Sequence, residues 1–152
     1  MSAQSLYPVN PELADSAHIN DETYQQLYKQ SVEDPSQFWK QQAMRLDWSK
    51  PFTEVKSTSF KKEDFHIRWF ADGELNTSAN CIDRHLVKNA QQIAITWEPD
   101  SETDAVKTYT YQQLHDEVCR LANGLKAIGV SKGDVVTLYM PMIPEAIFSM
   151  LA

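Results

Sequence analysis

A helical repeat between Thr110 and Gly129 constrains the fold of this chain more than any other pattern. Its apolar residues recur at steps of four, three, four and three, on one face of a helix: Leu114, Val118, Leu121, Leu125 and Ile128. Thr110 and Gln113 have capping-box spacing at the start, and Gly129 favours the end. An apolar run at 135–140 follows, typical of a buried parallel strand, and Pro144 begins another helix. This order predicts an α/β fold with right-handed crossovers.

The N-terminal third indicates an arm and two short helices. Residues 1–18 hold two prolines among small polar residues, so we expect an extended arm there. Asn20 is a good helix N-cap, and Asp34 caps a second helix that begins at Pro35. Because short helices with aromatic faces are marginal alone, these helices are expected to pack on a larger body.

Strand spacing occurs in three places. Apolar and polar residues alternate over 65–69, which predicts a strand. Residues 92–97 and 105–109 flank a polar loop, which predicts an antiparallel hairpin. Residues 48–62 show little periodicity, and no regular element is predicted for them.

The segment 69–85, Trp-Phe-Ala-Asp-Gly-Glu-Leu-Asn-Thr-Ser-Ala-Asn-Cys-Ile-Asp-Arg-His, has the most unusual composition. We expect Gly73 to supply a permissive turn conformation, and Asn80 to cap a helix with Asp83 in its first turn. The buried side of that helix is predicted to be Ile82, Leu86 and Val87. Arg84 and His85 are read as surface groups or partners of the capping loop, and no nucleophile is spaced to make His85 a catalytic base.

Composition narrows the function classes. The net charge is −7 and no basic cluster appears, which argues against a nucleic-acid partner. Cys81 and Cys119 do not form a disulfide framework, and Cys81 with His85 supplies only two of the ligands that zinc needs. No secretion signal or membrane span is visible, so we expect a cytoplasmic chain with no membrane partner. Residues 131–133, Ser-Lys-Gly, are the nearest approach to a phosphate loop and read as a plain turn.

The 69–85 segment resembles the N-terminal signature of the AMP-forming acetyl-CoA synthetases, W-F-x-G-G-x-L-N-x-x-x-N-C-x-D-R-H, with Asp72 where that signature has its first Gly. Residues 34–39 look like the early helix of that family. Residues 108–114 are similar to the first core motif of adenylate-forming enzymes, T-Y-x-E-L, with Gln113 in place of Glu. The resemblance continues through Gly133 and the 135–140 run.

This resemblance implies an N-terminal helical cap plus the first β-hairpin and β-α-β-α unit of an adenylate-forming large domain, incomplete. The implied boundaries are 1–18 for the arm, 19–88 for the cap region and 89–152 for the start of the AMP-binding domain. The family makes acetyl-CoA from acetate, ATP and CoA through an acetyl-adenylate, with Mg²⁺. Its catalytic and ligand-binding residues lie beyond position 152, so no catalytic, cofactor-binding or metal-binding residue is assigned here.

Three interpretations remain open from the sequence. The first is an N-terminal fragment of an acetyl-CoA synthetase, or of a related propionate enzyme, inactive alone and completed by the remainder of its own chain. Its apolar final helix and 135–140 run, which lack covering elements, favour this interpretation. The second is a non-catalytic protein-binding module, and the third is a small α/β nucleotide-binding protein. Only four glycines, none in a phosphate loop, argue against the third.

Overall fold

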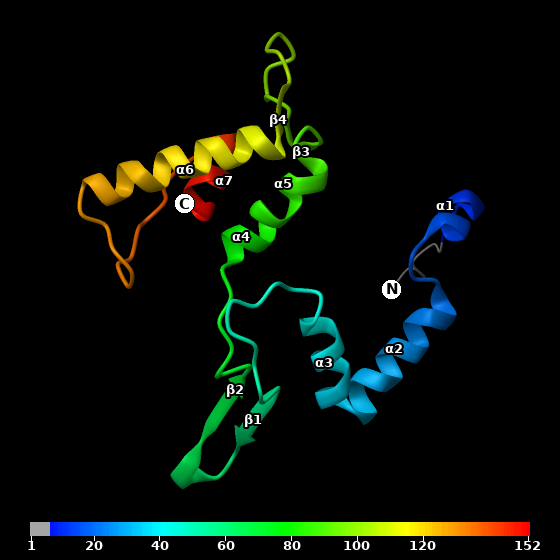
Figure 1. Ribbon diagram of the computed structural model, residues 1–152. Coiled ribbons are helices and arrows are strands. Elements are labelled where there is room, and N and C mark those ends of the chain that lie inside the picture. The colour runs from blue at the N-terminus through cyan, green and yellow to red at the C-terminus, as the bar shows by residue number, and fades with distance from the viewer. Residues whose placement is uncertain (1–6) are drawn as a thin grey trace, which may run out of the picture. The chain divides into compact units, whose positions relative to one another are not determined.

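The described part of the chain divides into two compact units (Figure 1). This computed structural model describes residues 7–152. Unit 1 comprises the described residues up to Asp47 together with Pro51–Gly73, and unit 2 comprises Trp48–Lys50 together with Glu74–Ala152. Each unit combines helices with one two-stranded antiparallel sheet, so both the helices and the strands of the expected α/β fold are present.

Three helices open unit 1, and a side chain caps each of them. Their bounds are α1 Pro11–Ser16, α2 Asp21–Glu33 and α3 Pro35–Ala43. The carboxamide of Asn20 accepts the backbone N–H of Thr23 at 2.9 Å, and the carboxylate of Asp34 accepts that of Gln37 at 3.0 Å. Both predicted caps are therefore confirmed.

Helix α1 corrects the extended arm predicted for residues 1–18. Asn10 accepts the backbone N–H of Glu12 at 2.9 Å, and Pro11 has the backbone angle that suits a first helical turn. This cap starts a short helix within the expected arm. Residues 1–6 of that arm lie outside the described residues.

The sheet of unit 1 pairs β1 (Lys56–Ser59) with β2 (His66–Trp69), joined by the short 3₁₀ turn η1 (Lys62–Asp64). The register places Lys56 opposite Trp69 and Ser59 opposite His66. Strand β2 was predicted, whereas β1 was missed because its polar sequence has no apolar alternation. Trp39 of α3 meets Trp69 edge-on with ring centroids 6.0 Å apart, which packs α3 against this hairpin.

Unit 2 begins with an isolated bridge and two short helices. Lys50 and Glu74 exchange both backbone hydrogen bonds, at 3.1 and 2.9 Å. Helix α4 (Thr77–Cys81) and helix α5 (Asp83–Asn89) follow. The predicted buried side of α5 is wrong at Val87, which is 91% exposed, while Ile82 at the junction of the helices is 1% exposed.

The predicted hairpin and long helix of unit 2 are confirmed. Strands β3 (Ile93–Trp97) and β4 (Lys107–Thr110) are antiparallel, and α6 (Tyr111–Ala127) starts directly after β4. The Thr110 hydroxyl accepts the Gln113 N–H at 3.2 Å, and the Gln113 side chain accepts the Thr110 N–H at 2.9 Å. Gly129 then ends the helical run with a φ of 93°.

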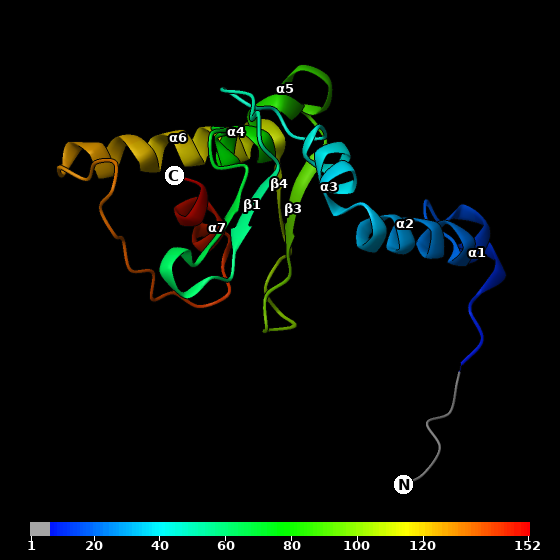
Figure 2. The ribbon, with the colours of Figure 1, turned by 90° about the horizontal axis from the view of Figure 1, so that it is seen from below.

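The core of unit 2 lies where α6 meets α7 (Pro144–Leu151) and the α4–α5 junction. Figures 1 and 2 both show α7 beside α6. Four side chains are buried together there: Ile82, Leu114, Val118 and Phe148. Tyr109 meets the Phe148 ring edge-on with centroids 5.2 Å apart, so β4 contributes to the same core.

The strand predicted at residues 135–140 is absent from the structure. This segment runs as an open connection between α6 and α7 (Figure 2), and its side chains are exposed. A strand forms only when its N–H and C=O groups pair with a neighbour, and none of the four described strands lies against this segment. The predicted second β–α step of unit 2 is therefore a loop followed by a helix.

Candidate functional site

The first part of the signature segment forms a tight turn in unit 1. Phe70 adopts the left-handed conformation with a φ of 48°, which is uncommon for a residue other than glycine. Its N–H donates to the Val55 carbonyl at 3.0 Å, and its own carbonyl accepts the N–H of Gly73 at 3.0 Å. The prediction that Gly73 supplies the special conformation is wrong, because Phe70 takes that role.

Asp72, the departure from the family signature, fastens this turn to the preceding loop. Its carboxylate accepts the backbone N–H of Thr53 at 2.9 Å, the Thr53 hydroxyl, and the N–H of Glu54 at 3.4 Å. The hydrogen bonds from the Thr53 hydroxyl and backbone hold the pKa of Asp72 below its usual value of 3.8.

The second part of the signature segment lies in unit 2. The carboxamide of Asn76 accepts the Ala79 N–H at 2.9 Å and caps α4. Asn80 therefore does not cap the helix as predicted. Instead its amide donates to the Asn76 carbonyl at 3.0 Å, and its oxygen accepts from Arg84 Nη1 at 3.0 Å. Asp83 lies in the first turn of α5, as predicted.

The two histidines of unit 2, His85 and His115, contact side chains of their own unit, and His115 lies 3.7 Å (Nε2) from Asp83 Oδ1 and 3.4 Å (Nδ1) from Asp116 Oδ1. His85 is half-buried and its ring lies 5.0 Å, between centroids, from that of Tyr111. Cys119 Sγ lies 3.5 Å from Nε2 and 4.0 Å from Nδ1 of His115. If the sulfur lay along the lone pair of one ring nitrogen, its distance to the other ring nitrogen would be much longer than its distance to the first. The sulfur therefore lies beside the ring and not on a proton-transfer path.

The cysteines and the possible metal ligands can be located in the described residues. Cys81 and Cys119 are free and exposed. Within residues 7–152, no group of three or more His, Cys, Asp or Glu side chains is arranged to hold a metal ion. No helix in the same range is long and apolar enough to cross a membrane.

The turn at residues 131–134 is closed by its own carboxylate. Asp134 Oδ2 accepts the Ser131 N–H at 2.8 Å and the Ser131 hydroxyl at 3.0 Å. These bonds lower the pKa of Asp134. The predicted turn is confirmed. The Asp134 carboxylate already accepts from the Ser131 N–H and hydroxyl, which are the donors that a phosphate would need, so this turn does not suit an anion.

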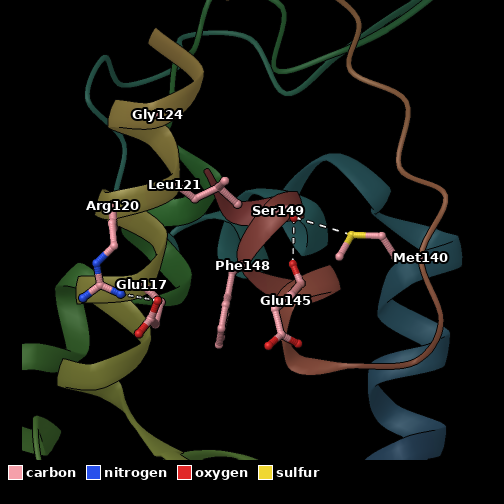
Figure 3. Close-up of a pocket in the computed structure, with 8 residues that line it drawn as sticks. All are labelled: Glu117, Arg120, Leu121, Gly124, Met140, Glu145, Phe148 and Ser149. Carbon is pink, nitrogen blue, oxygen red and sulfur yellow. Dashed lines mark hydrogen bonds and ion pairs between the residues drawn. The ribbon is translucent and has the colours of Figure 1, made fainter. Parts of the chain in front are cut away.

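A pocket of about 400 Å³ lies between α6 and α7 (Figure 3). Leu121 and Phe148 lie between the two helices, and Met140 lies beside Ser149 of α7 (Figure 3). The lining residues are Glu117, Arg120, Leu121, Gly124, Met140, Glu145, Phe148 and Ser149. Sequence reasoning missed this pocket, because only tertiary packing brings α7 and Met140 to α6.

Two polar groups of this pocket, the Arg120 guanidinium and the Ser149 hydroxyl, have protein partners. Arg120 Nη1 donates to Glu117 Oε2, and this bond raises the pKa of Arg120. The Ser149 hydroxyl donates to the Glu145 carbonyl at 2.7 Å. The lining has two carboxylates and one guanidinium. An apolar pocket with surplus negative charge suits a hydrophobic side chain, and it repels a triphosphate.

Two family models together match residues 24–152. One, described as acetyl-coenzyme A synthetase N-terminus, matches residues 24–81. The other, described as AMP-binding enzyme, matches residues 82–152. The fold and these matches define the N-terminal portion of an AMP-binding enzyme.

Curated relatives make the assignment more specific. The chain is 54% identical to the acetyl-coenzyme A synthetase of Novosphingobium aromaticivorans, over 98% of this chain and 23% of that protein. It is 53% identical to acetyl-coenzyme A synthetase 1 of Pseudomonas aeruginosa and 54% identical to the acetyl-coenzyme A synthetase of Vibrio cholerae. Both matches cover this whole chain and 23% of the relative. The chain belongs to the acetyl-coenzyme A synthetase family, and it spans about a quarter of the length of these relatives.

A solved structure of an acyl-CoA synthetase has a similar fold over most of this chain. The acetoacetyl-CoA synthetase of Streptomyces lividans matches 92% of this chain and 21% of its own, with a TM-score of 0.71 and 26% sequence identity. The fold expected from the resemblance is therefore confirmed at the level of the acyl-CoA synthetases.

Proposed function

We propose that this chain is the structural N-terminal part of an AMP-forming acetate–CoA ligase. One observation carries the proposal. More than half of its residues are identical, over essentially its full length, to proteins named acetyl-coenzyme A synthetase, of which it spans 23%. The complete enzyme would convert acetate, ATP and CoA to acetyl-CoA, with Mg²⁺, through an acetyl-adenylate. We place it in the cytoplasm, without nucleic-acid or membrane partners.

The described residues fit a supporting role better than a chemical one. Holding a triphosphate requires free backbone or cationic donors, and two candidate donors of this chain are already engaged. Ser131 is bonded to Asp134, and Arg120 is bonded to Glu117. No step of the reaction is therefore assigned to this chain, and ATP, CoA and Mg²⁺ belong to the whole enzyme. The boundaries proposed for its parts are 1–18, 19–88 and 89–152.

The first test is catalytic. The 152-residue chain mixed with ATP, Mg²⁺ and acetate should release no pyrophosphate, and addition of CoA should yield no AMP. A coupled pyrophosphate assay measures the first quantity, with a complete relative as positive control. Pyrophosphate release that depends on acetate would contradict the supporting role.

The second test replaces the N-terminal part of a complete relative with this chain. The matching N-terminal quarter of the Vibrio cholerae relative can be exchanged for this chain, which is 54% identical to it. The chimera should form acetyl-CoA, and its preference for acetate over propionate should follow the host remainder. A folded chimera without acetyl-CoA formation would refute the assignment. A stable complex between the separate chain and the intact relative would favour a binding module instead.

A further inference from the structure

Three polar side chains of unit 1 form a continuous hydrogen-bonded row on the β1–β2 hairpin (Figure 1). Ser57 Oγ lies 3.2 Å from Nε2 of His66. Nδ1 of the same ring lies 3.2 Å from Asp64 Oδ1 and 3.1 Å from the Asp64 carbonyl oxygen. A hydroxyl, an imidazole and a carboxylate in this order are the parts of an activated serine nucleophile.

The groups around the His66 ring determine where its proton lies. At Nδ1 the ring meets the carboxylate and the carbonyl of Asp64, and both of these groups can only accept a hydrogen bond. In the neutral ring Nδ1 therefore carries the hydrogen, and the lone pair is on Nε2. The Ser57 hydroxyl must then donate to Nε2, so the ring is oriented as a base toward this hydroxyl.

The hairpin backbone places the serine beside the imidazole. The register of β1 and β2 sets Ser59 opposite His66. Ser57, two residues before Ser59, lies on the same face of the sheet and is a diagonal neighbour of His66. Asp64 is the last residue of η1, and its backbone N–H closes that turn with a hydrogen bond of 3.1 Å. The turn thus holds the carboxylate within reach of the ring two residues further on.

Burial and charge indicate what this row of side chains can do. The His66 side chain is 21% exposed, whereas that of Asp64 is 72% exposed. Because water screens an exposed carboxylate, Asp64 orients the ring and adds little charge stabilisation. Arg68 lies opposite Ser57 in the register, and within residues 7–152 its guanidinium pairs with no carboxylate. This guanidinium is a cation on the same face as the serine, where it can stabilise an oxygen that becomes negative.

We propose that Ser57 is a nucleophile that accepts acyl groups from small activated esters, with His66 as its general base and Asp64 as the positioning residue of the ring. An exposed guanidinium stabilises an oxyanion less than a buried pair of N–H groups does. The reaction therefore needs an ester whose leaving group departs readily, such as a phenolate. It is not a step of the proposed ligase reaction, and its failure would leave that proposal unaffected.

The acyl transfer has two halves. First, Ser57 Oγ forms a bond to the acyl carbon, and the bond from that carbon to the leaving oxygen breaks. The hydroxyl proton passes to His66 Nε2 and from there to the leaving oxygen. Second, a water molecule gives a proton to Nε2 while its oxygen attacks the acyl-serine. Ser57 Oγ takes that proton as the carboxylic acid departs, which restores the hydroxyl.

The first experiment treats the 152-residue chain with an alkyl fluorophosphonate, from which a serine nucleophile displaces fluoride. Peptide mass spectrometry should find the label on Ser57, and His66→Gln should lower the labelling rate by about tenfold or more. Release of p-nitrophenolate from p-nitrophenyl acetate should fall by a similar factor in Ser57→Ala and in His66→Gln. Ser59→Ala is the matched control and should change neither rate, because Ser59 lies on the same face but its oxygen accepts the Lys61 N–H at 3.3 Å.

The same labelling is repeated in the chimera with the Vibrio cholerae remainder, so that loose packing of the separate chain cannot conceal the result. Absence of label on Ser57 in both proteins would overturn the proposal. Unchanged p-nitrophenolate release in Ser57→Ala would also overturn it, because the ester would then react with another side chain. Labelling of Ser57 that is independent of His66 would refute the role of the histidine as base.

The second experiment tests the role of Asp64 through the tautomer of His66. The nitrogen NMR shifts of the isotope-labelled His66 ring report which ring nitrogen carries the proton. Asp64→Asn should move the proton toward Nε2, because the Asn amide can donate to Nδ1, and it should slow p-nitrophenolate release. Asp64→Glu keeps the carboxylate and should retain the Nδ1–H form. The same tautomer population in Asp64→Asn as in the unchanged chain would refute the positioning role.

Discussion

Replacing Ile82 by Ala tests whether the α4–α5 junction anchors the core of unit 2. Ile82 is 1% exposed and packs with Leu114, Val118 and Phe148. The change removes three carbon atoms, which at ~0.8 kcal/mol per buried methylene corresponds to about 2.4 kcal/mol of transfer free energy. The residual cavity adds to this, and the expected total is about 3–4 kcal/mol of unfolding free energy.

Urea unfolding followed by far-UV circular dichroism measures this loss, and thermal unfolding should show a Tm lowered by roughly 6–12 °C. Val87→Ala is the control, because Val87 lies on α5 but is 91% exposed. It should change the free energy of unfolding by no more than about 0.5 kcal/mol. Equal losses in the two variants would refute the assignment of the core to one side of this junction.

Three further predictions concern the turns and helix ends. Asn76→Ala should lower the free energy of unfolding by about 1 kcal/mol, because the cap of α4 is lost. This loss should exceed that of Asn80→Ala. Urea midpoints of the two variants check the order, and the reverse order would contradict the prediction. Because the folded pKa of Asp72 is lowered, its contribution to stability is present above pH 3.8 and lost as pH falls through the folded pKa. Asp72→Asn should therefore weaken the pH dependence of the free energy of unfolding below pH 4. An unchanged pH dependence would contradict the inference that the Asp72 carboxylate fastens this turn. Gly129→Ala should lower the free energy of unfolding by about 1 kcal/mol, because Gly129 has a φ of 93°. Gly124→Ala, with open space for its Cβ, should raise it by up to about 1 kcal/mol. Tm shifts of equal sign would contradict one of these two predictions.

Features decided within a few residues were predictable from the sequence. The caps at Asn20, Asp34 and Thr110 depend on a side chain and a backbone amide three positions further along the chain, and the structure has them where expected. The β3–β4 hairpin was likewise indicated by two apolar runs around a polar loop. Local chemistry thus determined most helix starts.

Features that depend on distant partners were predicted less well. Residues 135–140 have the composition of a strand, but strand formation needs a neighbour that composition does not provide. Strand β1 shows the opposite case, since its polar residues form a strand because β2 is available. At the α4–α5 junction, Asn76 and Asn80 are both good capping residues, and their sequence alone could not decide between them.

The pocket between α6 and α7 was also outside the reach of sequence reasoning. Glu117 and Arg120 have the three-residue spacing of a helical ion pair, which could have been noticed. Nothing in the sequence, however, places Glu145 and Met140 beside them. The family resemblance supplied the fold, and it assigned no ligand to this surface.

The reciprocal bonds between Lys50 and Glu74 make residues 51–73 an insertion whose two ends meet. A protease that cuts once between β1 and β2 would leave both halves attached at that bridge, so unit 2 would stay in one piece. A shortcut of a few residues from Lys50 to Glu74 would likewise remove the hairpin with little added closure entropy. Such a deletion would also take away Trp69, so α3 would lose the ring on which Trp39 packs.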